Sequence, residues 1–235
     1  MNPSASAAVA ALNLHFFLDY PGEAARRLEL MSADEVADLL AAQPPHAVVP
    51  VWEQLASDVE QAVIERLPDG MVRHLLTELE PALSAALLNR LDPDKRQHCI
   101  ALLDPQIAAE LKTLMDYRAD SAGQLMDPRI ITLRSEFTVQ EALTRLRTIK
   151  RREVHEVFLV DDAGQLEGRV RIQDLAMSDP DLPLEQLRRK ISAAVTDIAP
   201  REEVVELLDR SDVTDLPVVD FSGRLVGVIR QSALV

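Results

Sequence analysis

The acidic residues, Asp and Glu, are the residues of this sequence whose side chains could most clearly bind a ligand, because their carboxylates can hold cations. The 235-residue chain carries 39 Asp and Glu against 25 Lys and Arg, for a formal net charge of −14 at pH 7. Four acids crowd one predicted helix and the turn that follows it: Glu202, Glu203, Asp209 and Asp212. Carboxylate oxygens are the ligands that hard cations prefer, but an acidic surface can also serve solubility alone. The composition leaves both explanations open.

Several other function classes are disfavoured. Nucleic-acid binding needs a concentrated basic patch, and the only basic cluster, at residues 150–152, is short and is followed by Glu153. No nucleophile–base pair, zinc-ligand spacing or phosphate-binding glycine loop is recognisable, so we expect no enzyme. His46, His74 and His98 stand on different predicted helices without a second ligand one turn away, which argues against a metal site built on them.

The ends of the chain and its single cysteine bear on the compartment. No run of about 18 apolar residues is present, so we expect no membrane span. Residues 1–19 lack the basic start of a signal peptide and are predicted to be an N-terminal segment with a frayed first helix. Cys99 cannot form an internal disulfide and lies in a helical pattern, so we expect a buried structural thiol in a reducing cytoplasm.

A repeat of twelve residues organises the first half of the chain. Most of the repeat positions open the same kind of turn, as in "LPDG", "LDPD" and "LDPQ". Between turns lie about nine residues with apolar side chains at helical spacing, and such short helices must bury their apolar faces on neighbouring repeats. We therefore predict a superhelix of short helices from about residue 20 to residue 116. The repeat positions are Met31, Gln43, Leu55, Leu67, Leu79, Leu91, Leu103 and Met115.

The turns with the sequence Leu-Asp-Pro suggest how each helix begins. We expect Asp92 and Asp104 to cap the helices that follow them by accepting backbone N–H bonds. Pro93 and Pro105 would then fill the first helical positions, where a missing N–H does no harm.

A second duplication organises the other half of the chain. Residues 157–175 align without a gap to residues 216–234, at a spacing of 59 residues that pairs Gly164 with Gly223. Each copy reads as a buried strand, an Asp-x-x-Gly turn and a returning strand. An amphipathic helix precedes each hairpin and a short strand precedes each helix. The predicted unit is therefore β-α-β-β-α, present twice.

The tandem "V-D-x-x-G-x-L-x-G" units resemble a pair of CBS domains. The helical repeat followed by "Y-x-x-D-S-A-G-x-L-M", then "P-x-x-I-x-L" and this pair, is similar to the cytosolic half of MgtE-type magnesium transporters. The resemblance implies an α+β multidomain fold with a right-handed N-terminal superhelix. The expected boundaries are 20–116 for the superhelix, 117–126 for a hinge, 127–182 for the first CBS unit and 183–235 for the second.

The resemblance also implies several weak Mg²⁺ sites between acidic faces that close when metal binds. The positions matching family ligands are Glu202 in the second CBS unit and Asp212 in the loop after its helix. The other candidates are Asp209, Glu203, Asp120, Gly123, Glu78, Glu80 and Asp94, with Asp92 and Asp116 nearby. The solvated-surface explanation remains open for each of these residues singly.

The nucleotide signature of CBS units is incomplete in this chain. Arg171 stands where the first unit should have a hydroxyl, and only Asp174 remains to hold a ribose. Arg230 and Ala233 leave neither group in the second unit, so ATP binding is disfavoured, although the two arginines could attract phosphate. Arg230 also adds positive charge to a segment that is acidic in family members, which should weaken any metal site there.

The resemblance implies two partners: a second copy of the chain, bound through the CBS units, and a transmembrane pore domain of the same transporter. We interpret the chain as the regulatory part of such a transporter at the cytoplasmic face of the membrane, and as an excised fragment of it. The alternatives are a CBS sensor of adenine nucleotides and a protein-interaction scaffold without metal sensing. The affinity of each acid for Mg²⁺ and the ion selectivity of the pore lie beyond what the sequence determines.

Overall fold

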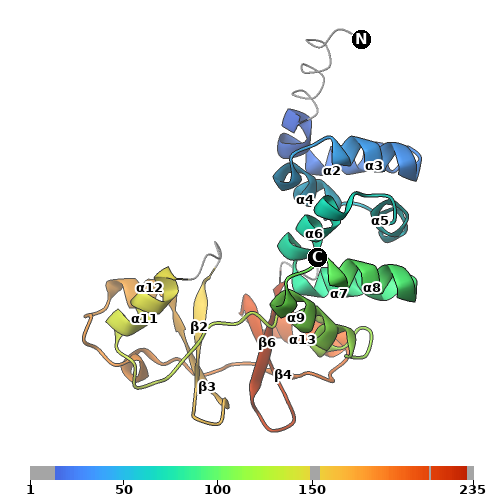
Figure 1. The fold of residues 1–235 in the computed structure, drawn as a ribbon. Helices are drawn as coiled ribbons and strands as arrows, with labels where there is room; N and C mark the ends of the chain where they lie inside the picture. Colours follow the sequence, from blue (N-terminus) through green and yellow to red (C-terminus); the bar gives the residue numbers. More distant parts are fainter. Residues whose placement is uncertain (1–13, 149–153, 212, 232–235) are drawn as a thin grey trace. The chain divides into compact units, whose positions relative to one another are not determined.

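The computed structural model describes residues 14–148, 154–211 and 213–231, which divide into two compact units between Asp116 and Tyr117 (Figure 1). The division falls where the sequence predicted the end of the superhelix. Residues 14–19 are helical, as expected for a first helix, and the rest of the N-terminal segment lies outside the described residues.

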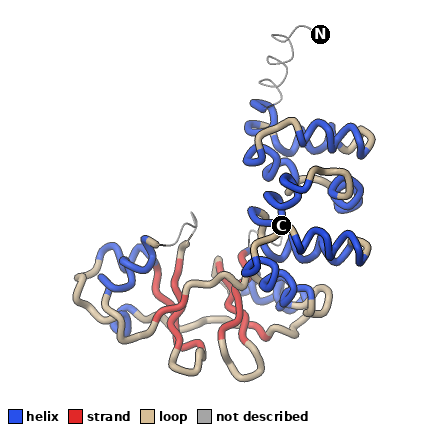
Figure 2. The backbone as a smooth tube through the Cα atoms, viewed as in Figure 1, coloured by secondary structure: helices blue, strands red, loops and turns tan. Residues whose placement is uncertain are grey.

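The first unit is a stack of short helices whose starts repeat every twelve residues. The helices are α2 (Pro21–Leu28), α3 (Ala33–Ala41), α4 (Pro45–Trp52), α5 (Ser57–Ile64), α6 (Asp69–Glu78), α7 (Pro81–Arg90), α8 (Pro93–Ala101) and α9 (Pro105–Met115). Each helix from α2 to α7 contacts the helix two further along the chain, and Figure 2 shows these layers joined by tight turns. The predicted twelve-residue repeat is confirmed.

The repeat positions explain why the helices stack. Gln43, Leu55, Leu67, Leu79, Leu91 and Leu103 are all buried, whereas Met31 is 38% exposed in the first turn. Burying a leucine side chain contributes about 1.5–3 kcal/mol, which a helix of eight to eleven residues cannot obtain alone. Cys99 is fully buried as predicted, and burial raises the pKa of its thiol.

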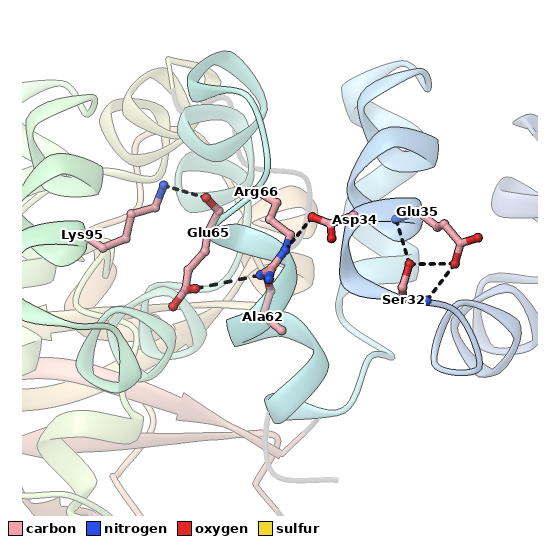
Figure 3. A network of polar contacts seen from close by, with 7 residues as sticks. All are labelled: Ser32, Asp34, Glu35, Ala62, Glu65, Arg66 and Lys95. Atoms are coloured by element: carbon pink, nitrogen blue, oxygen red, sulfur yellow. Dashed lines mark hydrogen bonds and ion pairs between the residues drawn. The ribbon is translucent and has the colours of Figure 1, made fainter.

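Polar contacts within and between the repeats lie on the outside of the stack (Figure 3). The Arg66 guanidinium donates to Asp34 at 2.8 Å, and the Lys95 ammonium donates to the Glu65 carbonyl at 3.3 Å. Ser32 and Glu35 form a reciprocal capping box at the start of α3. Exposed pairs of this kind contribute at most about 1 kcal/mol each, so they fix register while apolar burial supplies the stability.

One detail of the predicted helix starts is wrong. Asp92 and Asp104 do occupy the N-cap positions of α8 and α9, and Pro93 and Pro105 open those helices, but neither aspartate side chain caps the backbone. The Asp104 carboxylate instead accepts a hydrogen bond from Arg73 at 3.0 Å. At this site the aspartate forms an ion pair with a residue of α6 instead of a cap on α9.

The second unit contains two three-stranded sheets with the same connectivity. Sheet 1 comprises β1 (Thr132–Leu133), β2 (Glu156–Val160) and β3 (Leu166–Arg171), and sheet 2 comprises β4 (Val195–Thr196), β5 (Asp215–Val219) and β6 (Leu225–Arg230). In each sheet the short first strand is parallel to the second, which forms an antiparallel hairpin with the third. Gly164 and Gly223 both adopt φ of 80° in the hairpin turns, a conformation that favours glycine.

The helices around the sheets follow the predicted order. They are α10 (Ala122–Leu125), α11 (Val139–Arg147), α12 (Ile172–Met177), the 3-10 helix η1 (Leu184–Leu187) and α13 (Arg201–Arg210). The β-α-β-β-α prediction is confirmed in full for the first repeat. The last helix of the second repeat would fall on 232–235, which lies outside the described residues.

The two sheets exchange the segments that precede them. Asp127, ahead of sheet 1, pairs with Val228 of β6 through two backbone hydrogen bonds of 2.8 and 3.0 Å. Arg189, ahead of sheet 2, pairs with Arg169 of β3 in the same way, at 2.9 and 3.1 Å. The two hairpin turns also bond to one another, as their proximity in Figure 1 indicates. The third strand of each sheet is therefore hydrogen-bonded along its outer edge by a segment from the other repeat.

This exchange predicts that the chain cannot be divided at the expected boundary between residues 182 and 183. Leu184 belongs to the apolar core of sheet 1, so residues 127–182 alone would lose a core side chain. We expect peptides 127–182 and 183–235 to be unfolded, whereas 117–235 should unfold in one cooperative transition by circular dichroism. Dispersed amide NMR spectra from either half would contradict this expectation.

Candidate cation and nucleotide sites

Two of the predicted metal ligands, Asp120 and Glu202, line the same surface hollow of the second unit. Asp120 precedes α10 and Glu202 lies in the first turn of α13. The backbone joins the two segments, because the Arg201 N–H donates to the Asp120 carbonyl at 2.9 Å. Asp120 has a left-handed φ of 59°, and its N–H donates to the Gln124 side chain at 3.1 Å. The structure thus brings together two acids that are distant in sequence.

The remaining acids of α13 are spread along its exposed surface. Val204 and Leu208 turn inward, while Glu203 and Asp209 are exposed. Glu206, which the sequence analysis did not single out, pairs with Arg210 one turn later. Asp212, one of the two best-matched family positions, lies outside the described residues.

The predicted acids of the first unit are not gathered into a cluster. Glu78 and Asp94 are exposed near the ends of different helices, and Glu80 is half-buried just before α7. Partial burial raises the pKa of Glu53, and the Glu80 carboxylate adds to that rise. Glu53 was not among the predicted residues, and the helical repeat is the signal that could have placed it beside Glu80.

Gly123 serves a packing role that the sequence analysis did not foresee. Its N–H donates to the Asp197 carbonyl at 2.7 Å, and a Cβ at this position would lie 2.4 Å from the Tyr117 ring. Burial raises the pKa of Tyr117, and the nearby carboxylates of Asp197 and Asp220 raise it further. Position 123 therefore requires glycine because the Tyr117 ring packs directly against its backbone.

Asp174, the predicted ribose ligand, is already engaged by two guanidinium groups. Its Oδ2 lies 3.0 Å from Arg189 Nε and 3.4 Å from Arg171 Nε. Arg189 was missed in the sequence, because it reaches this place only through the exchanged segment described above. A nucleotide ribose would have to compete with these arginines for the carboxylate.

Arg230, which the sequence analysis identified as an added positive charge, pairs with a buried carboxylate in the structure. Its Nη2 lies 3.0 Å from Asp127 Oδ2, and the Asp127 side chain is only 4% exposed. Arg129 Nε lies 3.6 Å from the other oxygen of the same carboxylate. The charge of Arg230 is therefore largely compensated within the unit, and its predicted weakening effect on a nearby metal site should be small.

A small cavity between the two sheets is lined by acids that occupy equivalent positions in the duplication. Glu156 and Asp215 begin β2 and β5 and both line it. Glu156 pairs with Arg169 at 3.0 Å, but Val228 stands at the position equivalent to Arg169 in the second repeat. Burial raises the pKa of Asp215, an effect that Arg230 partly offsets. The 59-residue alignment could have identified this pair.

His98, one of the three histidines considered in the sequence, contacts an aspartate of α6. His98 Nε2 lies 2.9 Å from Asp69 Oδ1, an exposed pair. Within the described ranges, no group of three or more His, Cys, Asp and Glu is arranged to hold a metal ion. Among the same residues, no helix is long and apolar enough to cross a membrane.

Family models match nearly the whole chain. The MgtE intracellular N domain matches residues 20–120, and the CBS domain matches residues 122–181 and 188–235. The magnesium transporters MgtE of Thermus thermophilus and Bacillus subtilis are 35% and 30% identical over 123 residues, about half of this chain. The match covers only 27% of the length of each transporter.

Solved structures agree with this assignment. A crystal structure of the cytosolic domain of the Mg²⁺ channel MgtE in complex with ATP matches 94% of this chain and 92% of its own, with a TM-score of 0.86 and 28% identity. The soluble part of a magnesium transporter matches with a TM-score of 0.69 at 18% identity, which supports the fold alone. The chain is an MgtE N domain followed by a CBS pair, homologous to the MgtE magnesium transporters.

Proposed function

We propose that this chain is a Mg²⁺-sensing regulatory module that gates a magnesium transporter. The observation that chiefly supports the proposal is the match to an MgtE cytosolic domain over 94% of the chain. No part of the match points to an enzyme, because the named relatives are transporters and their cytosolic domains. The regulatory role would reside in how the two units respond to the ion.

The physical basis of sensing is charge repulsion relieved by a cation. Two carboxylates about 4 Å apart repel by roughly 1–4 kcal/mol, depending on the local dielectric. Mg²⁺ prefers oxygen ligands and keeps several of its waters, so pairs of carboxylates form weak sites suited to cellular concentrations. A chain with a net charge of −14 would therefore close when Mg²⁺ binds and open when it leaves.

The partners follow from the family. We propose a second copy of the chain, bound through the CBS pair, and a transmembrane pore domain of the same transporter at the cytoplasmic face of the membrane. The match covers 27% of the length of each of these transporters, and a conformational change of this chain would act on such a pore.

A titration with Mg²⁺ tests the proposed function. We expect the purified chain to become more compact by small-angle scattering and more resistant to protease at millimolar Mg²⁺. Glu202→Gln combined with Asp212→Asn should raise the midpoint several-fold, because two candidate ligands lose their charge. Asp38→Asn with Asp58→Asn, two exposed acids on α3 and α5, is the control with the same charge change.

The outcomes separate the competing functions. If both double variants shifted the Mg²⁺ midpoint equally, compaction would result from general charge screening and not from binding at Glu202 and Asp212. A chain that does not respond to Mg²⁺ would be a scaffold, and the sensing proposal would be wrong.

A nucleotide sensor is the second candidate, because the matched MgtE structure is a complex with ATP. In this chain the Asp174 carboxylate faces Arg171 and Arg189, which could contact phosphates only by leaving Asp174. The same titration with ATP in place of Mg²⁺ tests this candidate. Compaction by ATP that Asp174→Asn abolishes would favour nucleotide sensing.

A further inference from the structure

The cavity between the two sheets contains two acids that occupy equivalent positions in the duplication but have unequal partners. Glu156 begins β2 and Asp215 begins β5, and both line the cavity. The Glu156 carboxylate lies 3.0 Å from Arg169 of β3, and the Glu156 side chain is 9% exposed. The position equivalent to Arg169 in the second repeat is occupied by Val228, which carries no charge. Asp215 therefore lacks the arginine that pairs with its counterpart.

The arginine opposite Asp215 in the hairpin is paired with a different carboxylate. The register of β5 and β6 places Arg230 opposite Asp215, but Arg230 Nη2 lies 3.0 Å from Oδ2 of the buried Asp127. A proton on Asp215 would thus leave Arg230 with a carboxylate acceptor. A proton on Glu156 would instead deprive the largely buried Arg169 of its acceptor, and an uncompensated buried charge is strongly unfavourable. Asp215 is the acid of this pair that can become neutral without breaking an ion pair.

The size of the cavity limits what it can hold. Its volume is about 30 Å³, which is room for about two water molecules. A nucleobase or another organic ligand does not fit such a space. A proton needs no additional space, so protonation of a lining carboxylate is compatible with the packing around the cavity.

The elements packed around Asp215 bring charges of both signs to it. These groups are Arg230 on β6, Glu156 on β2, His155 just before β2, Arg169 on β3 and Arg129 ahead of β1. Burial raises the pKa of Asp215 despite the opposing effect of Arg230, and the Glu156 carboxylate raises it further. The environment of this carboxyl group therefore favours its neutral form.

We propose that Asp215 binds a proton and thereby couples the packing of the two sheets to pH. When Asp215 is ionised, its carboxylate repels that of Glu156 across the cavity, and like charges at close range oppose the approach of the sheets. When Asp215 is protonated, this repulsion is absent and Arg230 remains paired with Asp127. Proton binding is a function separate from Mg²⁺ sensing, because Asp215 is not among the proposed metal ligands.

The direction of the pH dependence follows from the raised pKa. The folded chain binds the Asp215 proton more tightly than the unfolded chain does. The resulting stability is present at low pH and is lost as the pH rises through the pKa of Asp215 in the folded state. Above that pH, the folded chain contains a partly buried charge that disfavours its packing.

Carbon-13 NMR of the side-chain carboxyl groups tests proton binding directly. The full wild-type chain is titrated in the presence of EDTA, and the Asp215 signal is assigned through the backbone. Its midpoint should lie above the ordinary range of an aspartate. In hydrogen exchange, the protection factors of the Asp127 and Val228 amides, which join the two repeats, should fall as the pH rises through this midpoint.

Two variants at equivalent positions test the coupling to stability. At about pH 8, Asp215→Asn should raise the melting temperature by about 2–4 °C, and the difference from the wild type should disappear as the pH falls through the titration. The protection factors should no longer change with pH in this variant. Glu156→Gln is the matched control and should lower the melting temperature at every pH, because Arg169 loses its acceptor.

Three results would overturn the inference: an Asp215 signal that titrates in the ordinary range, an effect of Asp215→Asn that is the same at every pH, or a lower melting temperature of Asp215→Asn at about pH 8. The last result would mean that Arg230 depends on the Asp215 charge. The NMR titration uses the wild-type chain alone, so it decides the question even if neither variant folds.

Discussion

Replacing Arg230 with methionine should lower the free energy of unfolding by about 2–3 kcal/mol. The Asp127 carboxylate is 4% exposed and lies 3.0 Å from Arg230 Nη2. Removing one partner of a buried pair leaves an uncompensated charge, which costs about 3–5 kcal/mol. Arg129 lies 3.6 Å from the same carboxylate and should retain part of the compensation. Urea denaturation followed by circular dichroism measures the difference.

The control is the pair of Arg224 and Asp220, which is more exposed than the pair of Arg230 and Asp127. Their side chains are 57% and 17% exposed and 3.3 Å apart, so Arg224→Met should cost less than about 1 kcal/mol. Asp127→Asn in the Arg230→Met background should recover most of the loss, because the buried charge is then gone. Equal effects of the two arginine substitutions would show that burial of Asp127 does not decide the outcome.

Gly123→Ala should destabilise the second unit by about 1–3 kcal/mol, the usual range for an overpacked position. The added Cβ would lie 2.4–2.7 Å from three atoms of the Tyr117 ring, so the ring must leave its place beside Asp197. Gly123→Val should cost more, because its two methyl groups enlarge the clash. Thermal and urea denaturation of the full chain measure both.

A double-mutant cycle identifies the cause. In a Tyr117→Ala background the ring is absent, so Gly123→Ala should cost only a few tenths of a kcal/mol. Gly70→Ala in α6, where a Cβ meets nothing within 4 Å, should be neutral or slightly stabilising. An undiminished penalty in the Tyr117→Ala background would locate the constraint on Gly123 elsewhere.

Substitution of Gly123 also tests the predicted hinge. The sequence predicted a hinge over residues 117–126, and that assignment remains a prediction. Within the second unit, this segment is bonded to Asp197 and Ala199 ahead of α13, and Asp127, directly after it, is bonded to Val228 of β6. A variant that expels Tyr117 would loosen the start of this segment. Gly123→Val should therefore impair Mg²⁺-driven compaction even with every acid retained.

The sequence by itself determined the two periodicities, and through them most of the fold. The twelve-residue repeat of Leu55, Leu67 and Leu79 predicted helix starts that the structure confirms, because short helices must bury one side chain per turn of the superhelix. The 59-residue duplication predicted both hairpins, since Gly164 and Gly223 mark the same turn. Local chemistry and repetition are sufficient for predictions of this kind.

The tertiary structure alone decided which charged residues meet. Arg230 reaches Asp127, and Arg189 reaches Asp174, because each sheet takes the segment that precedes the other. No local pattern in the sequence reports such an exchange. Another non-local backbone bond, from the Arg201 N–H to the Asp120 carbonyl, brings Asp120 and Glu202 to one hollow. The sequence could name the acids of this protein, but only the non-local backbone pairing determines which acids share a site, because side-chain proximity across such distances depends on topology rather than on spacing.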